Sequence, residues 1–215
     1  MTMLSDMLVM LLLLANMRLL SSSRVAACIQ TVAFQGVLLG AIALTAFPHH
    51  LTLEMIGLTL STVAVKSLLL PWLLRRAVRG GGVSREVEPF VGFGWSVLIG
   101  AGLLGLCFVI SRPLQASAPS GSAAMLIPGA MFTILTGLFI IVSRRKALTQ
   151  VIGYLTMENG VYVFGASLAI EEPLLQQLGI LLDVFVAVFV MGIVIYQINR
   201  EFDHIDTDRL SVLKD

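Results

Sequence analysis

Long apolar stretches separated by short polar or basic segments dominate the pattern of this chain. Seven stretches of about 20 residues or slightly more lie at residues 3–20, 25–47, 51–74, 90–111, 124–142, 147–170 and 174–198. A helix of about 20 apolar residues, rising 1.5 Å per residue, crosses the roughly 30 Å hydrocarbon core of a bilayer. The pattern therefore predicts an all-α, polytopic membrane protein with about seven transmembrane helices.

The composition agrees with this prediction. Hydrophobic residues make up 57% of the 215 residues and charged residues only 13%, and the mean hydropathy is +0.94. Soluble domains average about 45–50% apolar residues. The net charge of +1 gives no reason to expect nucleic acid as a partner, so the lipid bilayer is the expected environment.

The basic residues predict the orientation of the chain. Twelve of the fourteen Lys and Arg residues follow the first, third, fifth and seventh stretches. Because cytoplasmic loops carry an excess of Lys and Arg, the C-terminus is expected in the cytoplasm and the N-terminus outside. We therefore expect a multi-pass protein of the cytoplasmic membrane.

Small residues mark two of the stretches as candidates for close helix packing. Gly36 and Gly40 form an edge on the second stretch, and the fourth stretch carries several glycines. Small residues let helix backbones approach closely in lipid, where packing drives association. Cys28 and Cys107 lie far apart in separate stretches, so we expect buried apolar side chains rather than a disulfide or a thiol metal site.

A weak internal repeat organises the chain. At an offset of about 122–124 residues, the first three stretches match the last three, and both copies point the same way through the membrane. This predicts a parallel repeat, with a first unit at 1–74, a connecting part at 75–123, a second unit at 124–200 and a cytoplasmic tail at 201–215. In this alignment Gln35 and Ser61 lie near the positions of Glu158 and Asp183.

Two acidic residues interrupt the last two stretches. Glu158 lies about eleven residues from either end of the sixth stretch, and Asp183 lies nine residues inside the seventh. Helical rise places both roughly 14–16 Å from a surface, on consecutive antiparallel helices. Because a carboxylate at mid-bilayer depth costs at least a few kcal/mol, it usually faces the protein interior and serves a proton or ion path. We therefore predict proton-exchange sites at Glu158 and Asp183.

The alternative for these acids is a structural role. Each carboxyl would then be protonated or hydrogen-bonded to a donor such as Asn159, Thr156 or Tyr154. Lys66, fifteen residues inside the third stretch, also has two interpretations. Its stem could carry the ammonium to the membrane surface, or the ammonium could tune an acid or relay protons to it. We include it as the third candidate residue of the proton path.

Signatures of catalysis are missing from the sequence. We find no phosphate-binding glycine loop, no nucleophile elbow, no cysteine ligand set and no pair of buried histidines suited to haem. We therefore expect no cofactor, no metal site and no catalytic residue in this chain.

Four segments of the chain form a recognisable set: Arg144–Gly160, Leu178–Asp183, Val65–Pro71 and the tail segment Ile205–Leu210. The most specific of them contains the run Met157-Glu158-Asn159-Gly160. Together they resemble one known family, the membrane subunit called hydrogenase-4 component E, and the resemblance covers nearly the whole chain.

The resemblance implies a non-catalytic subunit in the membrane arm of a group 4 nickel-iron hydrogenase, as in formate hydrogenlyase. Its last three helices are similar to the K-type subunit of respiratory complex I and the C-type subunit of multisubunit sodium/proton antiporters. The implied partners are antiporter-like and complex I H-type membrane subunits, and peripheral nickel-iron hydrogenase and iron–sulfur subunits. Two proton-path acids are implied near Glu158 and Asp183.

The sequence thus favours a membrane subunit that contributes buried carboxylates to a proton or sodium path coupled to redox chemistry in partner subunits. One alternative is a purely structural assembly scaffold of such a complex. A second is a subunit of a multisubunit cation/proton antiporter. An independent small transporter is disfavoured, because the repeat is parallel and no broken helix pair is evident.

Overall fold

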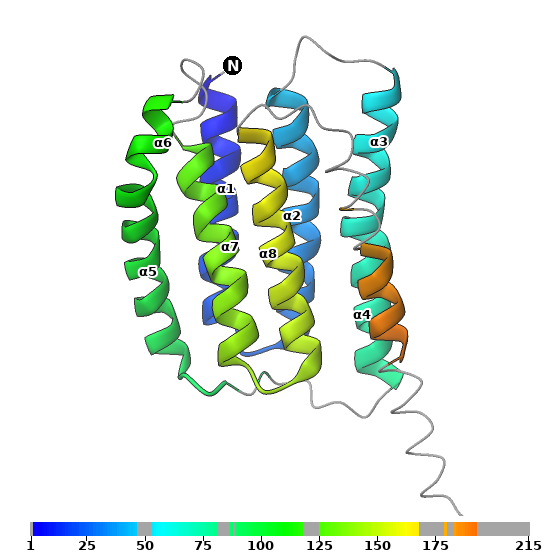
Figure 1. Ribbon diagram of the computed structural model, residues 1–215. Coiled ribbons are helices and arrows are strands. Elements are labelled where there is room, and N and C mark those ends of the chain that lie inside the picture. The colour runs from blue at the N-terminus through cyan, green and yellow to red at the C-terminus, as the bar shows by residue number, and fades with distance from the viewer. Residues whose placement is uncertain are drawn as a thin grey trace, which may run out of the picture.

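The computed structural model describes residues 2–46, 53–80, 87, 89–117, 125–167, 179 and 183–192. These residues are almost entirely helical (Figure 1). The helices in chain order are α1 Thr2–Ser21, α2 Val25–Ala46, α3 Leu53–Ala64, the π-helix η1 Val65–Leu69, α4 Leu70–Gly80, α5 Phe93–Ile110, α6 Arg112–Ser117, α7 Leu126–Ser143, α8 Ala147–Ser167 and a last helix, Asp183–Gly192. The predicted all-α membrane fold is confirmed.

Four of the described helices are long and apolar enough to cross a bilayer: Met3–Ser21, Val25–Thr45, Phe93–Ile110 and Leu126–Ser143. The third predicted stretch forms α3, η1 and α4, which follow one another without a break and end at Gly80, six residues beyond the predicted boundary at 74. Most of the seventh predicted stretch and the predicted tail 201–215 lie outside the described residues, so the count of seven spans stays a prediction.

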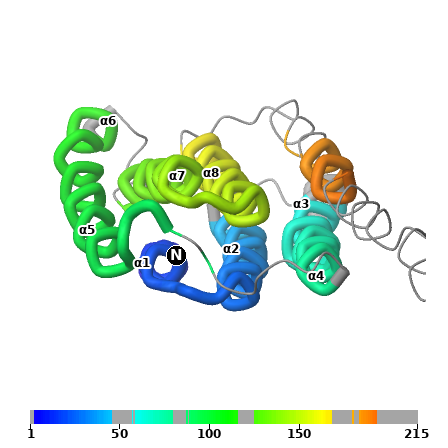
Figure 2. Tube along the Cα trace, turned by 90° about the horizontal axis from the view of Figure 1, so that it is seen from below, coloured from blue at the N-terminus to red at the C-terminus, as the bar shows by residue number. Residues whose placement is uncertain are grey.

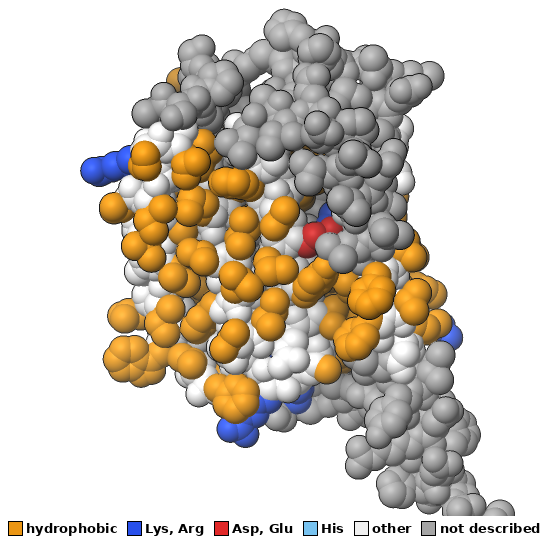
Figure 3. All heavy atoms as spheres, viewed as in Figure 1, with side chains coloured by type: hydrophobic (Ala, Val, Ile, Leu, Met, Phe, Trp, Pro, Cys, Tyr) orange, Lys and Arg blue, Asp and Glu red, His pale blue; other side chains and the backbone are white. Residues whose placement is uncertain are grey.

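The helices form two layers (Figure 2). One layer contains α1, α2 and the α3–η1–α4 rod, and the other contains α7, α8 and the Asp183–Gly192 helix. α1 packs against α7 and α2 packs against α8, while the last helix lies beside the α3–η1–α4 rod in both views. α5 lies at one end, against α1 and α7. Hydrophobic side chains cover the middle of one face, and basic side chains gather at its lower edge (Figure 3).

α7 and α8 form the closest helix pair, and glycine makes this possible. A Cβ atom built on Gly137 would lie 2.6 Å from the carbonyl oxygen of Gly153 and 2.7 Å from the Cα atom of Met157. A Cβ atom on Gly160 would lie 2.6 Å from the backbone nitrogen of Ile134. Since backbone atoms cannot rotate away as side chains do, these glycines set the distance between the two helices.

The glycines that the sequence marked for close packing, on α2 and on α5, differ in their contacts. Gly36 and Gly40 of α2 meet the α3–η1 segment, as expected for close packing. On α5, Gly100 meets Leu20, whereas a Cβ atom at Gly92, Gly94, Gly102 or Gly105 would meet nothing within 4 Å. Within the described residues, close approach along α5 therefore occurs at Gly100 alone.

A short segment before α5 ties two interhelical turns together. The backbone N–H of Val87 donates to Ser23 O at 2.8 Å, in the turn between α1 and α2. The N–H of Phe90 donates to Ser143 O at 2.8 Å, in the turn between α7 and α8, and the Arg145 guanidinium lies 4.6 Å from the centre of the Phe90 ring. This segment therefore fixes the start of α5 to both layers.

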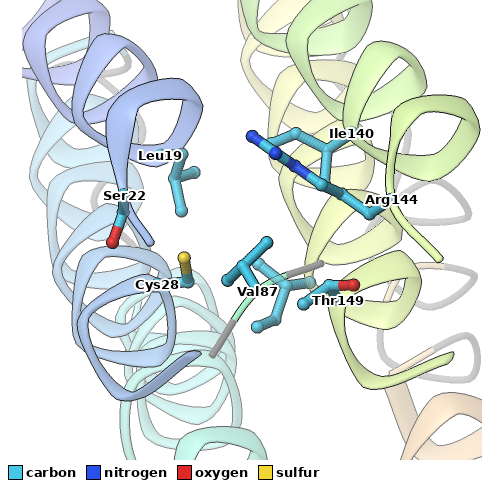
Figure 4. A pocket seen from close by; sticks show the side chains of 8 residues that line it. Leu19, Ser22, Cys28, Val87, Ile140, Arg144 and Thr149 are labelled. Atoms are coloured by element: carbon cyan, nitrogen blue, oxygen red, sulfur yellow. The ribbon is translucent and has the colours of Figure 1, made fainter. Parts of the chain in front are cut away.

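Arg144, at the end of α7, is buried at the same place. Its Nη2 donates to Leu20 O at 3.1 Å, and its guanidinium lies 5.0 Å from the centre of the Phe93 ring. Burial lowers the pKa of Arg144 because desolvation disfavours the charged form, and the carbonyl and the ring offset part of that cost. Figure 4 shows the side chain beside a small pocket that Cys28 and Thr149 also line.

Both Cys28 and Cys107 are buried and free, as predicted.

Candidate functional site

Lys66, Glu158 and Asp183 meet in the interior of the helix bundle. Lys66 Nζ lies 2.7 Å from Glu158 Oε1 and 3.2 Å from Asp183 Oδ1. Both separations are hydrogen-bond distances, so the ammonium donates to both carboxyl groups. The exposed fractions are 4% for Lys66, 7% for Glu158 and 0% for Asp183. The three residues that the sequence singled out thus form one cluster, the buried triad.

Three separate helical segments supply the triad. Lys66 belongs to η1 in the first layer, whereas Glu158 belongs to α8 and Asp183 to the Asp183–Gly192 helix, both in the second layer. The triad therefore joins the two layers. On the face shown in Figure 3, a small patch of acidic atoms, with a basic atom beside it, lies at about mid-height, away from the basic side chains at the lower edge.

A π-helical turn carries Lys66. The N–H of Leu70 donates to the carbonyl of Val65, five residues earlier, instead of to the carbonyl four residues earlier. Such a turn contains one more residue than an α-helical turn and therefore changes the direction of side chains on either side of it. Isolated π turns of this kind occur frequently at functional sites. The sequence analysis did not predict this turn.

The position of Lys66 argues against the first of its two interpretations, in which the stem carries the ammonium to the membrane surface; a role in tuning the acids or relaying protons stays a prediction. Its ammonium is buried and bonded to acids, so it does not reach the membrane surface. Two of the donors proposed for a purely structural role of the acids also bond elsewhere. Thr156 Oγ1 donates to Ile152 O at 2.9 Å, and Asn159 Nδ2 donates to Gln35 Oε1 at 3.4 Å.

The charges of the triad do not balance when every group is ionised. One ammonium faces two carboxyl groups, and Glu158 Oε2 and Asp183 Oδ2 are buried with no hydrogen-bond partner among the described residues. An uncompensated charge in a low-dielectric interior costs several kcal/mol. Uptake of one proton, or of one small monovalent cation, would make the cluster neutral. The arrangement is therefore suited to binding and releasing a single positive charge.

A second polar cluster links four helices beside the triad. Asn159 of α8 donates to Gln35 of α2, Gln35 Nε2 donates to Asn16 Oδ1 of α1 at 2.8 Å, and Asn16 Nδ2 donates to Thr133 Oγ1 of α7 at 2.8 Å. All four side chains are buried. We call this the amide chain. The sequence analysis marked Gln35 only as a repeat position and missed Asn16 and Thr133, although a polar residue inside an apolar stretch is a usable signal.

We expect the amide chain to stabilise the bundle without affecting the triad. Replacing Gln35 with Leu breaks two hydrogen bonds and leaves Asn16 and Asn159 with unpaired groups, at a cost of about 1–4 kcal/mol, since each hydrogen bond between membrane helices contributes roughly 0.6–2 kcal/mol. Thermal unfolding of the detergent-purified protein measures the loss. Thr31→Val is the control, because among the described residues the Thr31 hydroxyl donates within its own helix, to Ala27 O. An equal loss in both variants would contradict a role for the amide chain.

No group of three or more His, Cys, Asp or Glu side chains that could hold a metal ion is present in the described part of the chain. The triad contains two acids and a lysine, and the lysine occupies the place between the acids where a metal ion would have to lie.

Comparison with known proteins shows the family of the chain. A family model for NADH-ubiquinone/plastoquinone oxidoreductase chain 4L matches residues 124–215, which include Glu158 and Asp183 but not Lys66. An uncharacterized protein of Mycobacterium tuberculosis is 33% identical over 205 residues, 95% of this chain and 93% of that protein. No solved structure matches the chain.

Hydrogenase-4 component E of Escherichia coli is 32% identical over 154 residues, which are 72% of this chain and 71% of that protein. The Shigella flexneri protein of the same name gives the same values. This likeness extends across most of both chains and agrees with the resemblance found in the sequence. The chain belongs to the hydrogenase-4 component E family.

Proposed function

We propose that this protein is a membrane-arm subunit of a complex I-related hydrogenase complex and that the buried triad is a station on its proton path. The observation that carries the proposal is the bonding of one buried ammonium to two carboxyl groups. Redox chemistry would take place in peripheral nickel-iron hydrogenase and iron–sulfur subunits. Antiporter-like and complex I H-type subunits would be the membrane partners.

The triad has the properties that a proton station requires. With Lys66 protonated and one carboxyl protonated, the cluster is neutral and stable in a low-dielectric interior. A proton that arrives at Glu158 can leave from Asp183, because the Lys66 ammonium stabilises whichever carboxyl becomes ionised. The two acids therefore act as exchange sites, and the Lys66 ammonium makes the cluster neutral before a proton arrives and again after one has left.

Family membership supports the proposal. The Escherichia coli relative is named as a component of hydrogenase-4, and the matching family model is named for an oxidoreductase chain. We propose the orientation that follows from the basic residues, with the C-terminus in the cytoplasm and the N-terminus outside.

The Glu158→Gln, Asp183→Asn double variant tests the proposal. Both changes keep the size of the side chain and an acceptor for Lys66, but neither new group can exchange a proton. Because the variant leaves the Lys66 ammonium without a carboxylate, translocation is compared per assembled complex: proton translocation into membrane vesicles, measured with a pH-sensitive dye during turnover, is expected to fall at least about tenfold, as for the loss of a positioned acid–base group. Unchanged translocation at normal assembly would contradict the proposal.

The same experiment separates the proposal from the scaffold alternative. A scaffold would lose assembled complex in proportion to activity, so activity per assembled complex would stay constant. Measuring sodium uptake by the vesicles in place of proton uptake distinguishes a proton path from a sodium path. Asp6→Asn is a control for the mutagenesis, because it makes the same carboxyl-to-amide change near the start of α1, outside the triad.

A further inference from the structure

The position of Lys66 depends on a close contact between η1 and α2. η1 packs against α2 at Gly36. A Cβ atom built on Gly36 would lie 2.6 Å from Ser67 Oγ, 3.0 Å from Lys66 Cβ and 3.2 Å from the backbone carbon of Lys66. The α2 backbone therefore touches η1 at the residue that carries the ammonium.

These three contacts differ in how easily they can yield. The Ser67 hydroxyl can rotate away from an added methyl group. Lys66 Cβ and its backbone carbon cannot move without shifting η1, and both distances are already tighter than ordinary van der Waals contact. A methyl group at residue 36 would therefore displace the backbone of Lys66 away from α2.

Because Lys66 lies in the π turn, this displacement would also move its ammonium. Lys66 lies inside η1, where the changed backbone direction aims the side chain at acids of the other layer. Lys66 Nζ lies 2.7 Å from Glu158 and 3.2 Å from Asp183, so a small increase in either distance weakens that hydrogen bond. A shift of the backbone that carries the ammonium thus lengthens at least one of them.

We propose that Gly36 is a positioning residue for Lys66: its missing side chain lets the π turn of η1 sit against α2 and brings the ammonium within reach of both acids. The inference deepens the proposed function and rests on it for its effect on proton translocation. The geometric part stands on the contacts alone.

Gly40 provides a matched control on the same two helices. A Cβ atom built there would meet the tip of the Val63 side chain, with Val63 Cβ at 3.7 Å and Thr59 Cγ2 at 3.9 Å. Gly40→Ala therefore adds the same methyl group one turn away and presses on a side chain rather than on the Lys66 backbone. Gly102→Ala is a second control, since nothing lies within 4 Å of that position.

Two measurements on the assembled complex in native membranes test the proposal. The first is labelling of the Lys66 amine by acetic anhydride, quantified by mass spectrometry, which reports whether the ammonium is held by the acids. We expect labelling to rise several-fold in Gly36→Ala and to stay unchanged in Gly40→Ala and Gly102→Ala. The second is proton translocation, expected to fall on the order of tenfold to hundredfold in Gly36→Ala alone, as for an ångström of misplacement at a reacting group.

The outcomes are separable. Equal labelling in Gly36→Ala and Gly40→Ala overturns the positioning role, whatever happens to translocation. Raised labelling in Gly36→Ala, together with normal translocation in the Glu158→Gln, Asp183→Asn variant, supports the positioning role and overturns the proposed function. If Gly36→Ala does not assemble, the Gly36→Ala, Ser67→Ala variant removes the closest contact and retains the two with Lys66. That variant must show the raised labelling for the proposal to stand.

Discussion

Replacing Lys66 with Met is expected to destabilise the protein by about 3–5 kcal/mol and to abolish proton translocation, because removing one partner of a buried ion pair leaves uncompensated charge in the interior. The Lys66 ammonium donates to Glu158 and Asp183, so its loss affects both acids at once. Each acid also has a buried oxygen without a partner among the described residues, so the cluster has no second donor there to replace the ammonium. The yield of assembled complex after mild heating measures stability, and vesicle acidification measures translocation.

Two controls define the result for Lys66. Leu68→Met introduces the same side chain into the same π turn at a position that is 70% exposed, and it should change neither quantity. Lys66→Met in the Glu158→Gln, Asp183→Asn background should cost much less stability than Lys66→Met alone, since the acids that lose their cation are then neutral. An equal cost in both backgrounds would show that Lys66 acts through packing instead of charge.

Replacing Gly137 with Val is expected to prevent normal packing of α7 against α8. The first added carbon atom would overlap backbone atoms of α8, including Gly153 O at 2.6 Å. Overpacking a core costs about 1–3 kcal/mol when side chains can adjust, and here backbone must move, so we expect a cost of about 3 kcal/mol or more. Glu158 lies on α8 next to Met157, so the triad would be displaced as well.

The loss is measured as the fraction of protein that remains folded during a thermal ramp in mild detergent. Gly102→Val is the matched control, because it places the same side chain on α5 where a Cβ atom meets nothing within 4 Å. Similar melting temperatures for the two variants would contradict the account of the α7–α8 contact.

Much of this arrangement follows from sequence pattern because lipid imposes strict rules. Apolar stretches of bilayer length must be helices, so α1, α2, α5 and α7 begin and end within a few residues of the predicted limits. The same rules made Glu158 and Asp183 conspicuous, since charge in the hydrocarbon core needs a reason. Their assignment to a proton path stays a prediction, as do the repeat and its unit boundaries.

Other features depend on contacts between distant residues, which periodicity does not encode. The sequence left two interpretations of Lys66 open, because the contacts of its ammonium depend on how α8 and the last helix pack against η1. The π turn has no sequence signature that distinguishes it from the α-helix around it. Asn16 and Thr133 are ordinary polar residues until the packing of α1 against α7 pairs them.

The lysine of the triad comes from one layer of helices and the two acids come from the other, which matters for shorter chains. The first layer supplies Lys66, and the second supplies Glu158 and Asp183. A truncated relative that kept only the three helices of the second layer would hold two acids and no amine at this depth. The N-terminal helices of this chain therefore supply the cation that its two acids share.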